Sequence, residues 1–84
     1  MRTVKVYTKE GCQFSAQLMA LLESKQIPYE ERIVTLDSPE HHELGDKAGS
    51  MKLPLAFIGA IPLGGTQEVQ AAAANGMLDD LVAD

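Results

Sequence analysis

The sequence predicts a small α/β domain in which a four-stranded mixed sheet carries three helices, in the order β-α-β-α-β-β-α. Two strand-like stretches flank a helical segment near the N-terminus, two apolar stretches enclose a glycine-containing turn near residue 60, and an alanine-rich segment follows a pair of glycines. With 84 residues the chain is expected to form one domain over residues 1–84, because the remainder is too short to build a second hydrophobic core.

The first third of the chain predicts a strand-helix-strand unit. Residues 3–7 alternate apolar and polar side chains, which predicts a strand ending at residues 9–11. From Phe14 apolar side chains recur at helical spacing to about Lys25, and a proline soon after prevents further helix. Residues 29–34 are the second strand, so the two strands should pair in parallel through a right-handed crossover.

A short second helix is predicted to begin at residues 37–40, where a polar cap, a proline and an acidic residue follow one another. The helix is expected to end at Gly45 or Gly49, because glycine readily adopts the left-handed conformation of a helix C-terminus. His41 and His42 lie on this helix, and adjacent positions point about 100° apart, so a shared metal is not expected. Both histidines are therefore predicted to be solvated.

The last part of the chain predicts a hairpin followed by a third helix. Residues 53–58 are mostly apolar, and a Gly-Ala turn leads into residues 61–63 as an antiparallel partner. Pro62 predicts that this partner is an edge strand. After two glycines, Thr66 is expected to cap an alanine-rich helix that runs to Asn75, where the next glycine closes it.

Composition and charge exclude several classes of function. Acidic residues outnumber basic ones by 12 to 7 and the basic ones are scattered, so neither nucleic acid nor an anionic membrane surface is an expected partner. No stretch approaches the roughly 20 apolar residues of a membrane span, and the N-terminus does not resemble a signal peptide, so the expected location is the cytoplasm. One cysteine and two adjacent histidines supply neither a disulfide framework nor a zinc site.

Cys12 is the candidate reactive group, because it stands just ahead of the first predicted helix. Unpaired backbone N–H groups and the helix dipole favour the thiolate there, and Lys9 acts in the same direction if its ammonium approaches. The alternative is that Cys12 is a small buried apolar residue. Ser15, one turn further on, either donates a hydrogen bond to the thiolate or only helps to begin the helix.

Three motifs in the expected order give the sequence a resemblance to glutaredoxins, which have a thioredoxin-like fold. Residues 9–15 resemble the glutaredoxin active site with its second cysteine replaced by serine. Residues 52–54 are similar to the family's threonine, apolar residue and cis-proline, and residues 64–67 to its double-glycine turn before the last helix. The resemblance extends from about residue 3 to residue 78.

The resemblance implies a groove for glutathione as co-substrate. Lys9 would pair with its glycine carboxylate, and the backbone of Leu53 would pair with its cysteine beside a cis Pro54. The backbone N–H groups of Thr66 and Gln67 would receive the γ-glutamyl carboxylate. The glutathione-binding residues implied in this way are Lys9, Phe14, Leu53, Pro54, Gly65, Thr66 and Gln67.

The departures from the family pattern indicate a monothiol mechanism. Dithiol members have a proline and a second cysteine where this chain has Gln13 and Ser15, so no intramolecular disulfide can form. The Cys12 thiolate would attack the glutathione sulfur of a mixed disulfide, release the target thiol, and be freed by a second glutathione. Glutathione and glutathionylated or disulfide-bearing proteins are the expected partners, and a monomer is expected unless a cluster is bound.

Two alternatives stay open at this point. A [2Fe–2S] carrier would join two chains through their Cys12 thiolates and two glutathiones, which the Phe14-Ser15 pair favours by resemblance. Against it, the insertion between lysine and cysteine that such carriers have is missing, and a glutamine replaces their glycine. A redox-silent binding module is the other alternative, indicated by Gln13, by Lys52 in place of the usual threonine and by Gln67 in place of the preferred aspartate.

Overall fold

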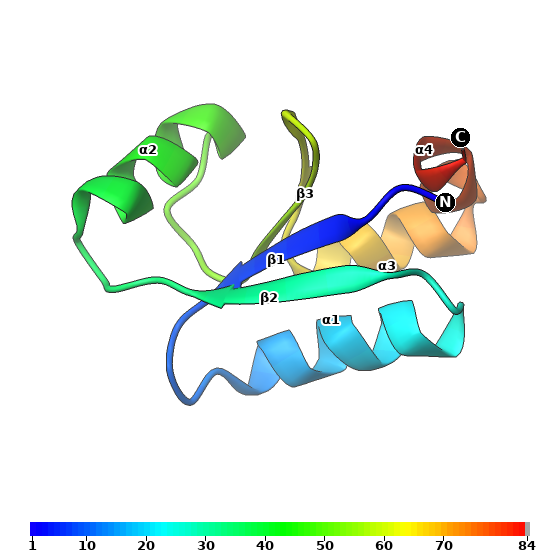
Figure 1. Cartoon of the computed structure of the whole chain (residues 1–84), viewed down its shortest axis with the longest axis horizontal. Helices are drawn as coiled ribbons and strands as arrows, with labels where there is room; N and C mark the ends of the chain where they lie inside the picture. Colours follow the sequence, from blue (N-terminus) through cyan, green and yellow to red (C-terminus); the bar gives the residue numbers. More distant parts are fainter. Residues whose placement is uncertain (84) are drawn as a thin grey trace.

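The computed structural model describes residues 1–83 and is organised by one four-stranded sheet (Figure 1). The strand order is β2-β1-β3-β4, with β1 and β2 parallel and the other pairs antiparallel, which confirms the predicted mixed sheet. The elements within this range are β1 (Val4–Thr8), α1 (Gln13–Ser24), β2 (Tyr29–Ile33), α2 (Pro39–Ala48), β3 (Leu55–Ile58), β4 (Ile61–Gly64), α3 (Thr66–Ala74) and α4 (Met77–Val82).

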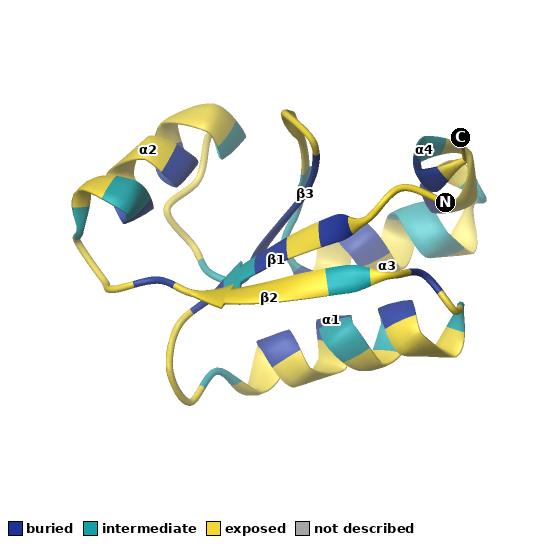
Figure 2. Ribbon diagram, viewed as in Figure 1, coloured by how far each residue is buried: buried dark blue, intermediate teal, exposed yellow. Residues whose placement is uncertain are grey.

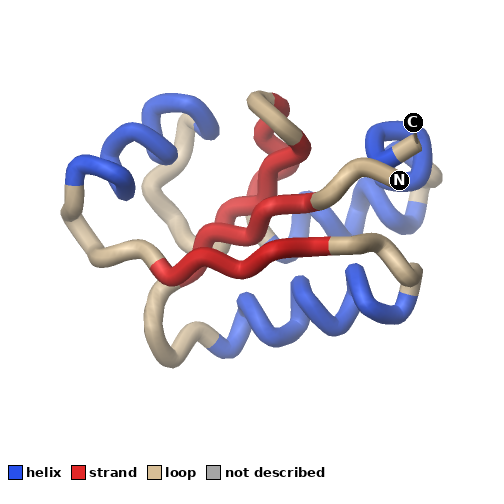
Figure 3. The backbone as a smooth tube through the Cα atoms, in the orientation of Figure 1, coloured by secondary structure: helices blue, strands red, loops and turns tan. Residues whose placement is uncertain are grey.

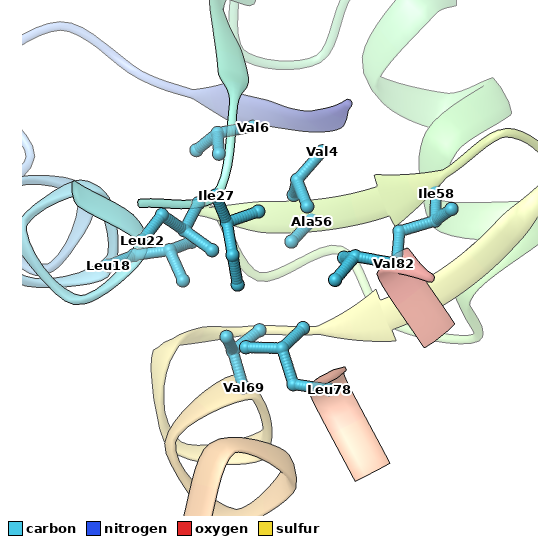
Figure 4. Packing of buried hydrophobic residues seen from close by; sticks show 10 residues of the cluster. All are labelled: Val4, Val6, Leu18, Leu22, Ile27, Ala56, Ile58, Val69, Leu78 and Val82. Atoms are coloured by element: carbon cyan, nitrogen blue, oxygen red, sulfur yellow. The ribbon is translucent and has the colours of Figure 1, made fainter. Parts of the chain in front are cut away.

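Helices cover both faces of the sheet (Figure 3). On one face α1, α3 and α4 pack over β1 and β3, and Figure 4 shows the cluster that they enclose. It consists of Val4, Val6, Leu18, Leu22, Ile27, Ala56, Ile58, Val69, Leu78 and Val82. On the other face α2 contributes Leu44 to a smaller cluster with Val34, Leu55 and Phe57. Figure 2 shows that β2 is exposed along most of its length, as an edge strand.

The predicted strand-helix-strand unit is confirmed in detail. β1 and β2 pair in parallel with Val4 opposite Tyr29, and α1 ends at Ser24 with Lys25 as its C-cap. The hairpin is also confirmed, because β4 follows β3 through a tight turn and lies at the edge of the sheet. Pro62 has no backbone N–H to donate, and an edge strand tolerates this. These elements were predictable because their apolar side chains follow the period of each element.

The second helix begins as predicted and ends at the later of the two candidate glycines. Ser38 is its N-cap and accepts a hydrogen bond from the His41 backbone N–H, while Gly49 is left-handed, with a φ of 72°. Gly45 lies inside the helix and is buried. The prediction that both histidines are solvated is wrong for His41, which is 6% exposed, whereas His42 is exposed. Both nitrogens of the His41 ring are hydrogen-bonded, which compensates its burial.

The C-terminal part contains a fourth helix that the prediction of three helices omitted. Gly76, with a φ of 82°, separates α3 from α4, and Leu78 and Val82 of α4 are buried in the larger core. The spacing of four positions between the apolar residues Leu78 and Val82 could have predicted this helix. Thr66 is the first residue of α3 and Gly65 is the N-cap, so the predicted capping role of Thr66 is wrong. No helix within residues 1–83 is long and apolar enough to cross a membrane.

Candidate functional site

Cys12 lies at the N-terminus of α1, where the backbone concentrates hydrogen-bond donors. It is the N-cap residue, with extended backbone angles, and it follows Gly11, whose φ of 74° lets the loop turn out of β1. The N–H groups of a helix's first turn have no carbonyl partner within the helix, and the dipole there favours negative charge. The residue is only partly buried, so its thiol is accessible.

The environment of Cys12 stabilises the thiolate. Partial burial by itself raises the pKa of the Cys12 thiol, because a charged sulfur loses hydration. Hydrogen bonds from the Ser15 side chain, the Ser15 and Phe14 backbone and the Thr8 side chain act in the opposite direction. They outweigh the burial, so the pKa of Cys12 lies below its ordinary value. This environment favours the thiolate, which is the form of cysteine that reacts as a nucleophile.

Ser15 and Thr8 form a buried pair of hydroxyls beneath the sulfur. Ser15 is 2% exposed and Thr8 is 1% exposed, and their Oγ and Oγ1 atoms are hydrogen-bonded to each other. Each hydroxyl has one hydrogen, so Thr8 can donate to only one acceptor at a time, the Ser15 hydroxyl, the Lys9 carbonyl at 3.2 Å or the Cys12 sulfur. Thr8 was missed from the sequence, although a polar residue on the inward-facing side of β1, after Val4 and Val6, was a usable signal.

Replacing Ser15 by alanine is expected to raise the pKa of Cys12, because the thiolate loses a hydrogen bond that the thiol does not need. Hydrogen bonds to charged groups contribute about 1.5–3 kcal/mol, less at a partly exposed sulfur, so alkylation near pH 6 should slow roughly three- to tenfold. The measurement is the rate of iodoacetamide alkylation against pH. Ser24→Ala is the matched control, since its exposed hydroxyl bonds only the Leu21 carbonyl. An unchanged pH profile in Ser15→Ala would contradict this role.

A hollow of about 260 Å³ brings most of the predicted binding residues together. Six of the seven line it, namely Phe14, Leu53, Pro54, Gly65, Thr66 and Gln67. The Thr66 hydroxyl donates to the Phe14 carbonyl across 2.9 Å, which fixes the start of α3 against the start of α1. Lys9 lines a different hollow, with Glu10 and residues 33–36. The hollow thus lies between the first turn of α1, the segment before β3 and the first turn of α3.

Backbone groups along two sides of this hollow lack partners. The Leu53-Pro54 peptide bond is cis, as the family resemblance implied, and within residues 1–83 neither the N–H nor the C=O of Leu53 takes part in a hydrogen bond. On the other side, the first intrahelical bond of α3 runs from Val69 N–H to Gly65 C=O. The N–H groups of Thr66 and Gln67 are therefore unpaired by the helix. This arrangement can receive an extended peptide with a terminal carboxylate.

Two charged residues also line the hollow. Lys52 comes from the segment before Pro54, and Glu68 comes from the first turn of α3, close to Gly65. Glu68 was missed from the sequence, and its place in the first turn after the double glycine was the signal that could have indicated it. With one cation and one anion, the hollow suits a zwitterionic ligand better than a purely anionic one.

This chain offers only one thiolate toward an iron–sulfur cluster. Cys12 is its single cysteine, and within residues 1–83 no three His, Cys, Asp or Glu side chains come together as metal ligands. A [2Fe–2S] cluster takes four ligands. Residues of a second chain and two glutathione thiols would have to complete the set.

Comparison with known proteins gives one consistent result. The sequence model of the family described as Glutaredoxin matches residues 4–60. Glutaredoxin 3 of Escherichia coli (strain K12) is 33% identical over 82 residues, which cover 98% of this chain and 99% of the relative. The solution structure of glutaredoxin from Brucella melitensis superposes with a TM-score of 0.79 at 32% identity, covering 98% of this chain and 89% of that one.

A more distant solved structure shows the same fold. The crystal structure of the buckwheat glutaredoxin–glutathione complex superposes with a TM-score of 0.82 at 21% identity, covering 94% of this chain and 74% of that one. The predicted thioredoxin-like fold is thereby confirmed, apart from the added fourth helix.

Proposed function

This chain belongs to the glutaredoxin family of thiol–disulfide oxidoreductases, and on that premise we propose that it reduces protein–glutathione mixed disulfides through Cys12 alone. The single observation that supports this most is a partly exposed thiol of lowered pKa on the helix whose first turn lines a peptide-sized hollow. A thiolate is the nucleophile that disulfide exchange needs. The lack of a second cysteine makes the mechanism monothiol.

The proposed reaction consists of two exchanges. The Cys12 thiolate attacks the glutathione sulfur of the mixed disulfide, the bond between the two original sulfurs breaks, and the target leaves as a thiolate that takes a proton from water. A second glutathione thiolate then attacks the glutathione sulfur bound to Cys12. Glutathione disulfide forms and the Cys12 thiolate is released. Overall, the target sulfur is reduced, the sulfur of the second glutathione is oxidised, the first glutathione sulfur passes from one disulfide to another, and Cys12 is unchanged.

The hollow is the proposed glutathione site. The free N–H and C=O of Leu53 would pair with the cysteine residue of the tripeptide in the manner of a β-strand, next to the Pro54 ring. The N–H groups of Thr66 and Gln67, after Gly65, would receive the γ-glutamyl carboxylate. Phe14 is 62% exposed at the rim of the hollow and would cover the peptide.

Charged side chains complete the proposed contacts. Gln67 replaces the aspartate that the family prefers, and Glu68 in the same hollow would receive the ammonium of the γ-glutamyl group in its place. Lys9 is proposed to pair with the glycine carboxylate from outside the hollow, and Lys52 adds positive charge within it. The protein partners are those that carry a glutathione on an accessible cysteine.

The direct test is to mix the protein with a glutathionylated peptide and reduced glutathione and to follow release of the peptide thiol. Turnover above the uncatalysed rate is expected, and without added glutathione the mass of the protein should rise by one glutathione. The matched control is the same preparation with Cys12 alkylated beforehand. A rate equal to the uncatalysed exchange would overturn the proposal.

Lys52→Ala is expected to raise the KM for glutathione about two- to fivefold, because an exposed charge contact contributes up to about 1 kcal/mol. Lys9→Ala should act in the same direction if Lys9 reaches the glycine carboxylate. The matched control is Lys47→Ala, an exposed lysine of α2 whose partner is Glu43. Initial rates at several glutathione concentrations measure the effect. Equal KM values for the Lys52 and Lys47 variants would remove Lys52 from the site.

A further inference from the structure

His41 joins the start of α2 to the segment that precedes Pro54. Its ring is buried, and the Asp37 backbone N–H donates to Nδ1 across 3.0 Å. Since Nδ1 is thereby an acceptor, the hydrogen of the neutral ring is on Nε2, and Nε2 donates to the Met51 carbonyl across 2.8 Å. The ring therefore bridges two backbone segments that lie ten residues apart in the chain.

The Met51 end of this bridge is two residues before Leu53, whose backbone faces the proposed glutathione site. Gly45 of α2 also contacts the segment of residues 50–53. Its carbonyl accepts a hydrogen bond from the Ser50 N–H across 3.2 Å, and the Met51 side chain packs against it. The remaining hydrogen bond, from the Lys52 N–H to the Ser50 hydroxyl, is local and exposed. His41 thus supplies the buried side-chain link between α2 and this segment.

We propose that His41 is a positioning residue for glutathione binding, which acts by holding the Met51 carbonyl and so fixing the Leu53 backbone at the wall of the hollow. This inference rests on the proposed function of that hollow. Cys12 is held by a separate set of contacts, from Thr8, Ser15 and the first turn of α1. Loss of the His41 link therefore weakens binding of glutathione while the intrinsic reactivity of the thiol is retained.

Two substitutions separate the two ends of the bridge. The Asn side chain in His41→Asn places an acceptor near the position of Nδ1 but is too short to reach the Met51 carbonyl. The Gln side chain in His41→Gln places an N–H donor near the position of Nε2 and loses the acceptor for the Asp37 N–H. Only the Gln variant keeps the link that the proposal requires, although each variant loses one hydrogen bond.

The first measurement is the KM for glutathione, beside the rate of Cys12 alkylation. His41→Asn is expected to raise the KM about three- to tenfold, the range of one hydrogen bond, with alkylation unchanged. His41→Gln should lie within about twofold of the original protein. Equal KM values for the two variants, or slowed alkylation in His41→Asn, would overturn the proposal. His42→Asn, on the exposed neighbouring residue, is the matched control.

A measurement without glutathione separates this inference from the proposed function. Backbone NMR order parameters of Lys52 and Leu53 should fall in His41→Asn and recover in His41→Gln. Unchanged order parameters would overturn the positioning role even in an active protein, and absence of any turnover in the original protein would overturn the proposed function instead. If His41→Asn does not fold, His41→Leu takes its place, because its apolar side chain fills the buried site without a donor for the Met51 carbonyl. It too should raise the KM, and an unchanged KM would count against the proposal.

Discussion

A Cys12→Ser variant is expected to lose at least about 10³-fold in turnover of a glutathionylated peptide, which brings it to the uncatalysed rate. A serine hydroxyl stays protonated at neutral pH and forms no mixed disulfide. No other cysteine in the chain can take over the exchange. Release of the peptide thiol, followed in the presence of reduced glutathione, measures the effect.

Thermal unfolding of Cys12→Ser is the control that shows whether the variant is folded. Serine is a preferred N-cap whose hydroxyl can accept from the same first-turn backbone N–H groups, so thermal unfolding should be unchanged or slightly improved. Retained turnover in a folded variant would show that the exchange does not pass through this sulfur.

Leu18→Ala is expected to lower the free energy of unfolding by about 2–5 kcal/mol, because it leaves a cavity where α1 packs on the sheet. Leu18 is fully buried and belongs to the larger core cluster with Val6 and Val69. Since domains of this size are stabilised by only about 5–15 kcal/mol, much of the protein should unfold at modest urea concentrations. Urea denaturation followed by circular dichroism measures the change.

The comparison variant for Leu18→Ala is Leu36→Ala. Leu36 is 56% exposed, so the same substitution should change the free energy of unfolding by no more than about 0.5 kcal/mol. Similar losses in the two variants would mean that the α1 contact contributes little beyond ordinary surface packing.

The sequence was sufficient for elements whose side chains repeat with a regular period. Leu18 and Leu22 follow the helical spacing that places α1 on the sheet, and Ser38 and Gly49 have the chemistry of the helix ends that they form. The fourth helix was harder to predict, because two buried apolar residues, Leu78 and Val82, are too few to establish a period. Gly76 before them is equally compatible with the end of one helix and the start of another.

The candidate site was predictable where it depends on one local segment. The helix start at Cys12 and the turn at Gly65 are examples, because the chemistry lies in the backbone of the motif itself. Thr8 and His41 were not identified, because each acts through a partner that only the tertiary fold brings near, Ser15 and Met51 respectively. Lys9 lies at a different hollow from the other predicted residues, because sequence spacing does not orient a long side chain.

The hydrogen bond between Thr66 and the Phe14 carbonyl joins residues 52 positions apart. During synthesis on the ribosome the reactive sulfur therefore emerges long before the helix that would recognise a substrate carboxylate. The contact between the starts of α1 and α3 therefore forms only after α3 is available, since long-range contacts need both segments. On the proposed function, the glutathione site would be complete only at that point.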